Sequence, residues 1–281
     1  KLFLIAVAIP FLLVVVVFFF AELSDDRIRK PVNIVHALGV PPSWPVSRAP
    51  EGISFYRAGQ DAPESACAKA LQSLALRLLK DNQDNETRVF LFNGVGRSIG
   101  ATGIALNTGY FLGKFVPRII FIEYPFEPSA LRPFYKVSSQ HPGITELIDG
   151  RAGFEDCVYT DYERNIDIIF APASEESKKA VSLIYKKVIA EAKKEYDMVI
   201  IDAPPISGCE TTEYLDMHAD VAVMIIQGDG SRYAEVRRAA ELFLRMDIPA
   251  VAPVLNWGGK KQKSPLQQFF QRPFLKYLVE S

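Results

Sequence analysis

Residues 198–205 read Met-Val-Ile-Ile-Asp-Ala-Pro-Pro, an apolar run that ends in a carboxylate and two prolines. Four consecutive apolar residues predict a strand that is buried on both faces, which is typical of a parallel sheet. Similar short runs alternate with amphipathic helical patterns from residue 88 onwards. This alternation predicts an α/β fold with a doubly wound, mostly parallel sheet. In such sheets ligands bind at the carboxyl ends of the strands, where Asp202 lies.

The same reasoning gives the expected elements of the whole chain. The expected strands are 88–92, 118–122, 165–170, 198–201, 219–227 and 250–256. The expected helices are 32–38, 64–80, 101–114, 144–149, 153–158, 176–194 and 233–246. The helix at 64–80 rests on Leu71, Leu74 and Leu78, which recur at helical spacing.

The first residues do not fit this globular pattern. Residues 2–21 read LFLIAVAIPFLLVVVVFFFA and carry no charge. About twenty helical residues rise roughly 30 Å, the thickness of a bilayer core. A signal peptide would have a shorter apolar stretch and a small-residue cleavage site, and a buried soluble helix would usually keep a polar face. We therefore expect one transmembrane helix at residues 1–21.

The charges around this span predict its orientation. Arg27, Arg29 and Lys30 follow it, whereas only Lys1 precedes it. Because positive residues stay on the cytoplasmic side, residues after 21 are expected in the cytoplasm. The sequence does not begin with Met, so we expect the C-terminal part of a longer chain whose earlier portion lies across the membrane.

Composition divides the rest of the chain. A proline-rich stretch predicts a semi-extended juxtamembrane linker at 22–60, with one short helix, before a P-loop-like domain at 61–259 and a tail at 260–281. The formal net charge is −1, from 32 Lys+Arg and 33 Asp+Glu. That balance argues against a general nucleic-acid-binding surface. The three cysteines are widely spaced, which indicates neither a disulfide framework nor a zinc site.

A glycine-rich segment follows the first predicted strand of the domain, and glycines before a helix let the backbone approach a phosphate. The candidate contacts are Gly94, Gly96, Arg97, Ser98, Gly100, Ala101 and Thr102. A working P-loop places lysine and then Ser or Thr after its last glycine. Here Ala101 replaces the lysine, although Thr102 keeps a hydroxyl for magnesium and Arg97 offers a partial substitute for the charge. A tight strand-to-helix turn without a ligand remains an equal alternative.

Asp202 is the second candidate. An apolar strand that ends in Asp is the Walker B arrangement, which holds magnesium directly or through water. Alone, such an aspartate is more often a turn or cap residue. The two prolines after it make the pattern more specific, so Thr102 and Asp202 are the expected magnesium ligands if a nucleotide binds. Asp202 is also the candidate catalytic residue in an active enzyme.

Several segments together resemble the bacterial tyrosine autokinases that are attached to polysaccharide co-polymerases, within the deviant P-loop ATPases. The segments that carry the resemblance are 26–31, 38–41, 142–150, 165–173, 196–205, 219–220 and 254–256. The resemblance implies a site for ATP or ADP with magnesium, and it places Asn256 near the nucleotide base. It also implies a homo-oligomer formed through the membrane and an upstream domain, in the bacterial inner membrane, with polysaccharide synthesis and export machinery as partner.

The departures from that family are equally informative. Ala101 replaces the P-loop lysine, and Glu123-Tyr124-Pro125 stands where the family carries Asp-x-Asp, with Leu131-Arg132-Pro133 as the remnant of the motif's end. Cys67 and Ala70 follow Glu64 where the family has two arginines for ring assembly. The tail has only Tyr277 in place of a tyrosine cluster. These losses imply a kinase-like domain without catalysis, a pseudokinase scaffold in exopolysaccharide biosynthesis, export and chain-length control.

Two alternatives stay open. One is an active but divergent tyrosine autokinase or ATPase that uses Arg97, Thr102 and Asp202 with magnesium. The other is a dinucleotide-binding domain, because the spaced glycines precede a helix and Glu123 ends the next predicted strand, where a ribose-binding acid would lie.

Overall fold

The computed structural model describes residues 12, 15–17, 19–20, 25–39, 44–124, 128–172, 181–206 and 218–258, with only the backbone for 181–186. Its strands are β1 (Trp44–Val46), β2 (Val89–Gly94), β3 (Ile119–Glu123), β4 (Tyr159–Asp161), β5 (Ile166–Ile169), β6 (Met198–Asp202), β7 (Val221–Gln227) and β8 (Ala250–Asn256). Its α-helices are α2 (Pro31–Leu38), α3 (Ala58–Asp61), α4 (Ala66–Asn85), α5 (Ala101–Leu112), α6 (Leu131–Tyr135), α7 (Ile144–Ile148), α8 (Val181–Glu195) and α10 (Tyr233–Arg245). Two 3₁₀ turns, η1 (Phe55–Arg57) and η2 (Glu155–Cys157), complete the described elements.

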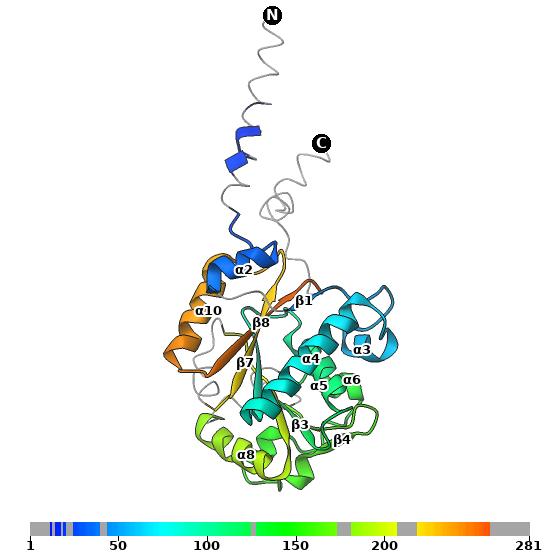
Figure 1. Ribbon diagram of the computed structural model, residues 1–281. Helices are drawn as coiled ribbons and strands as arrows, with labels where there is room; N and C mark the ends of the chain where they lie inside the picture. Colours follow the sequence, from blue (N-terminus) through cyan, green and yellow to red (C-terminus); the bar gives the residue numbers. More distant parts are fainter. Residues whose placement is uncertain are drawn as a thin grey trace, which may run out of the picture.

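The eight described strands form one sheet in the order β1-β8-β7-β2-β6-β3-β5-β4. Every neighbouring pair is parallel except β4 and β5, which are antiparallel. Helices cover both faces of this sheet (Figure 1). The predicted α/β fold with a mostly parallel sheet is therefore confirmed.

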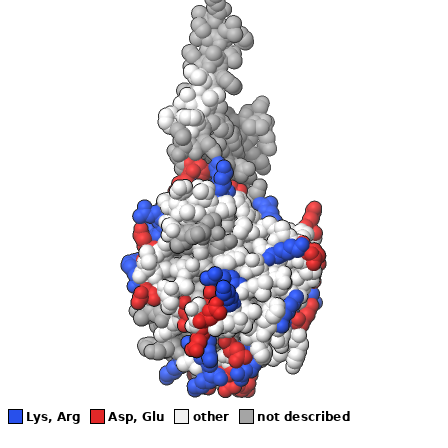
Figure 2. Space-filling view, viewed as in Figure 1, with Lys and Arg blue, Asp and Glu red and all other residues white. Residues whose placement is uncertain are grey.

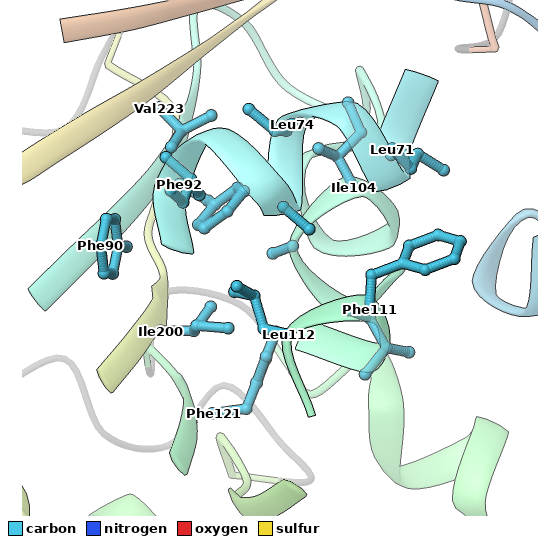
Figure 3. Packing of buried hydrophobic residues seen from close by; sticks show 14 of the residues in the cluster. Leu71, Leu74, Phe90, Phe92, Ile104, Phe111, Leu112, Phe121, Ile200 and Val223 are labelled. Carbon is cyan, nitrogen blue, oxygen red and sulfur yellow. The ribbon is translucent and has the colours of Figure 1, made fainter. Parts of the chain in front are cut away.

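Successive side chains along each strand point to opposite faces of the sheet, so the hydrophobic core lies in two layers, one on each face. Phe90 and Phe92 of β2 pack with the leucines of α4 and with α5, whereas Val89 and Leu91 face α8 on the other side. Figure 3 shows the first of these clusters, in which side chains from α4, α5 and several strands interdigitate. Because both faces are covered, the central strands need apolar residues at every position, as the sequence pattern predicts.

Most predicted elements are found. The strands expected at 88–92, 118–122, 165–170, 198–201, 219–227 and 250–256 are β2, β3, β5, β6, β7 and β8. Helix α4 ends later than expected, at Asn85, and its first turn is capped by the Ser65 hydroxyl, which accepts from the Ala68 N–H at 3.1 Å. The helix expected at 153–158 is instead the short turn η2, followed by the edge strand β4. A three-residue edge strand is too short to show a period in the sequence.

The structure also differs from the expected semi-extended linker at 22–60. Strand β1 pairs with β8, and the Ile28 N–H donates to the Ser231 carbonyl oxygen at 2.8 Å. Ile28 and Ile34 are buried in the cluster that contains α10, beside which α2 lies in Figure 1. Single apolar residues near prolines give no sequence period, yet Ile28 and Ile34 are buried against the domain.

The predicted tail at 260–281 lies outside the described residues, as does the predicted span at 1–21 apart from residues 12, 15–17, 19 and 20. Of the helices in the described part of the chain, none has both the length and the apolar character that crossing a bilayer requires.

The burial of α2 gives a stability prediction. Ile34→Ala should lower the free energy of unfolding by about 2–4 kcal/mol, because it leaves a cavity under α10. Val32→Ala is the matched control on the same helix, since Val32 is 49% exposed, and should change stability by less than about 0.5 kcal/mol. Urea unfolding followed by tryptophan fluorescence measures both. Equal effects of the two changes would mean that α2 is not part of the cooperative unit.

Candidate functional site

A cavity of about 500 Å³ opens at the carboxyl edge of β2, β3 and β6. Its walls are the glycine-rich loop with the start of α5, the ends of β3 and β6, residues 128–130 and residues 54–56. This is the position at which parallel α/β sheets bind ligands. Most of the predicted phosphate-contacting and magnesium-binding residues therefore line one cavity: Gly94, Gly96, Arg97, Ser98, Gly100, Ala101, Thr102 and Asp202.

The loop has the backbone geometry of a tight strand-to-helix turn. Gly100 has φ +88°, a left-handed conformation that glycine adopts without strain. A Cβ on Gly94 would lie 2.7 Å from the Gly96 carbonyl oxygen, so this glycine is also required. Helix α5 starts at Ala101, and its first N–H groups have no partner within the helix. The loop thus places the positive end of a helix at the cavity, where a phosphate could accept hydrogen bonds.

The charge of the cavity is the unusual feature. Of the described residues that line it, three are charged: Arg97, Glu123 and Asp202. Ala101 occupies the first position of α5, so the described wall offers no ammonium group there. Arg97 is exposed on the loop. On the side of the molecule seen in Figure 2, positive and negative side chains are interspersed.

Asp202 and Thr102 contact each other directly. The Thr102 hydroxyl donates to Asp202 Oδ2 at 2.6 Å. Burial raises the pKa of Asp202 to about 7, and the nearby Glu123 carboxylate raises it too, whereas the Thr102 hydrogen bond opposes the shift. The two predicted magnesium ligands are therefore adjacent, and their binding of magnesium stays a prediction.

Glu123 lies opposite Asp202 in the β3–β6 register, but its carboxylate has other hydrogen-bond partners. Its carboxylate accepts from the Ser129 hydroxyl, from the Leu131 N–H at 3.2 Å and from the Ala171 N–H at 3.2 Å. Burial raises its pKa, and these donors oppose that rise. Both oxygens of Glu123 therefore hold the cavity wall at 128–131, which leaves this carboxylate poorly placed to act as a base.

Sequence reasoning missed the wall at residues 54–56. Asn107, buried on α5, donates to the Phe55 carbonyl oxygen at 2.7 Å and accepts from the Gly59 N–H at 2.8 Å. This clamp places Phe55 and Tyr56 in the cavity wall. Burial, and then the charges of Asp202 and Glu123, raise the pKa of Tyr56. The sequence signal that could have indicated this wall is Asn107, a polar residue within the otherwise apolar pattern of the helix predicted at 101–114.

Two further predicted residues lie behind the cavity. Arg132 is buried and donates to the carbonyl oxygens of Ala171, Ser138 and His141, each at 2.9 Å. Asn256 is fully buried, and its amide donates to the Ile99 carbonyl oxygen at 2.7 Å. Neither lies among the residues that line the cavity.

The strand order disfavours the dinucleotide alternative. In that fold the acidic residue ends the strand next to the glycine-rich turn. Here β6 lies between β2 and β3, so the strand that ends in Glu123 is not the neighbour of the glycine-rich strand. Glu123 is also fully engaged with residues 128–131 and Ala171.

The fold is an α/β domain with a mostly parallel sheet and a glycine-rich strand-to-helix loop at the cavity. No protein-family model matches the chain. It is 22% identical over 214 residues to the tyrosine-protein kinase wzc of Salmonella typhimurium, covering 73% of this chain and 29% of that protein. The kinase domain of the Escherichia coli tyrosine kinase ETK superimposes with a TM-score of 0.71 at 15% identity, over 84% of this chain and 95% of that domain. The chimerical protein CapA2B2 gives a TM-score of 0.71 at 14% identity, over 82% of this chain and the whole of the other.

These comparisons confirm the predicted resemblance: the chain is similar to bacterial tyrosine kinases in sequence and in fold. It spans less than a third of the length of the Salmonella relative. The likeness to the solved structures shows the fold.

The raised pKa of Asp202 predicts a pH dependence of stability. Between its unfolded pKa near 3.8 and its folded pKa of about 7, the folded state binds more protons, so stability should fall as pH rises. Asp202→Asn should remove this contribution. The difference in unfolding free energy between variant and wild type should change by up to about 1.4 kcal/mol per pH unit across this window and stay constant above it. Urea unfolding from pH 4 to pH 8 measures it, and a pH-independent difference would contradict the prediction.

Proposed function

We propose that this chain is the kinase-like domain of a membrane polysaccharide co-polymerase, and that it acts as a catalytically inactive scaffold in exopolysaccharide biosynthesis, export and chain-length control. Its relationship to bacterial tyrosine kinases supports the first half of this proposal. The state of the catalytic groups supports the second half.

The observation that carries the proposal is the charge of the cavity. Phosphoryl transfer depends on cations that neutralise charge developing on the phosphate. The described wall holds two carboxylates, Glu123 and Asp202, against one cation, the exposed Arg97, and alanine stands where the family's lysine would be. Glu123 is held in place by three donors from the wall, so it is not available as the base. Binding without efficient transfer, or no binding at all, follows from this arrangement.

The membrane part of the proposal rests on residues 1–21. Their uncharged sequence supports a transmembrane helix in a bacterial inner membrane, with the residues after it in the cytoplasm. Helix α2, which begins at Pro31 after the predicted span, packs on the domain and would hold the domain close to the membrane surface. A homo-oligomer formed through the membrane and an upstream domain, in contact with polysaccharide machinery, completes the proposal.

A second candidate is an active, divergent ATP-dependent tyrosine autokinase or ATPase. The hydrogen bond between Thr102 and Asp202 favours it, because this pair is where a magnesium ion would be held. The cavity beside this pair also has a volume of about 500 Å³. Thr102 and Asp202 fit magnesium, and Arg97 with the first N–H groups of α5 would hold the phosphates. Bound magnesium would neutralise phosphate charge.

Restoring the missing cation tests whether the cavity is a phosphate site. Ala101→Lys should strengthen MgATP binding by about 10- to 100-fold, the range expected for one charge-assisted hydrogen bond. Ala101→Met is the matched control, since it adds a side chain of similar length without charge. Calorimetric titration of the full chain in detergent measures both. Equal affinity of the two variants would mean that the glycine-rich loop does not hold phosphate.

A measurement of catalytic activity distinguishes the inactive scaffold from the active enzyme. We expect ATP hydrolysis and tyrosine phosphorylation by the wild-type chain to be no faster than by Asp202→Ala, because alanine stands at the lysine position and Glu123 is held by three donors from the wall. Phosphate release and labelling with radioactive ATP measure these rates. A wild-type rate that is above background and is lost in Asp202→Ala would establish the active enzyme instead.

A further inference from the structure

Asn256 ends β8 and is completely buried behind the glycine-rich loop. Both polar atoms of its side chain have backbone partners. Nδ2 donates to the Ile99 carbonyl oxygen at 2.7 Å, and Oδ1 accepts from the Gly258 N–H at 2.8 Å. Nδ2 keeps a second N–H and Oδ1 keeps a second lone pair, but Asn256 has no exposed surface and is not among the residues that line the cavity, so neither atom faces a ligand there.

The loop is shaped around this amide. A Cβ on Gly100 would lie 2.6 Å from Asn256 Nδ2, so the loop can approach the amide only because residue 100 is glycine. The left-handed φ of Gly100 directly precedes α5. The amide therefore fixes the backbone at the point where the loop turns into the helix.

The backbone around Asn256 is fixed from two further sides. The Gly228 N–H donates to the Asn256 carbonyl oxygen at 2.9 Å, and the Trp257 N–H donates to the Val46 carbonyl oxygen at 2.8 Å. In the sheet register, Asn256 lies opposite Gln227 of β7 and Val46 of β1. The amide is thus carried by the sheet itself, and its position does not depend on the loop.

We infer that Asn256 is a positioning residue, which sets the shape of the glycine-rich loop and does not read the nucleobase. The inference concerns the site of the proposed function, but its structural part holds without any nucleotide. If Asn256 acts only through the loop, its loss weakens every nucleotide equally. If it contacts the base, its loss changes the preference between adenine and guanine.

The variants are Asn256→Asp, which replaces only the Nδ2 donor, and Asn256→Ala, which avoids a buried charge. Asn165→Asp is the matched control. It removes one asparagine donor, to the Gly113 carbonyl oxygen, at an exposed turn far along the chain from the loop.

The first measurement is amide hydrogen exchange of the ligand-free full chain. Both Asn256 variants should raise exchange at residues 94–102 by about tenfold or more, while β7 stays protected and shows that the domain is folded. The control should leave the loop unchanged. Unchanged exchange at the loop in both Asn256 variants would overturn the inference.

The second measurement is the affinity for MgATP and MgGTP, in the wild-type background and with Ala101→Lys. Both affinities should fall by the same factor in the Asn256 variants, so that their ratio is constant. A shift in the ratio would overturn the inference in favour of base recognition. If no nucleotide binds in either background, the nucleotide site fails, and the exchange measurement alone decides the role of Asn256.

Discussion

Strand β6 lies between β2 and β3, and its parallel pairing with both brings Asp202 level with Phe92 and Glu123. The whole site depends on this pairing. The glycine-rich loop leaves the carboxyl end of β2, so Thr102 at the start of α5 comes within 2.6 Å of the Asp202 carboxylate. Glu123 arrives from the other side and cannot move away, because β3 fixes its backbone. Two carboxylates at neighbouring strand ends are therefore a consequence of the strand order.

Two neighbouring carboxylates, Glu123 and Asp202, need cations, hydrogen-bond donors or protons to balance their negative charge. In a working P-loop, lysine and magnesium share that task with the helix N-terminus. Here alanine stands at the position of that lysine (Ala101). The Glu123 carboxyl is instead held by three donors from its own wall, while burial raises the pKa of Asp202 to about 7, so that a proton can take the place of a cation on Asp202.

The sequence predicted the parts of this structure that depend on pattern. Buried strands such as 198–202 and the glycine turn before α5 have local signals, because apolar runs and glycine spacing are visible one segment at a time. The proximity of Thr102 and Asp202 followed from placing each motif at a strand end. Strand β1 and the wall at Phe55 and Tyr56 had no such signal, since three-residue elements among prolines show no period. The direction in which Asn256 points also could not be predicted, because its partners Ile99 and Gly258 are brought to it only by the folded sheet and loop.

These unpredicted parts connect the beginning of the described chain to the site. The Ile28 carbonyl oxygen accepts from the Asp229 N–H at 2.9 Å, and the neighbouring Gly228 N–H donates to the Asn256 carbonyl oxygen. The amide of Asn256 then holds Ile99 in the loop. A chain cut at residue 61 would lose β1, η1 and this anchoring segment, and would expose the edge of β8 together with one wall of the cavity. Residues 25–39 and 44–60 are thus part of the site's framework, because they hold the backbone around Asn256 and form one wall of the cavity.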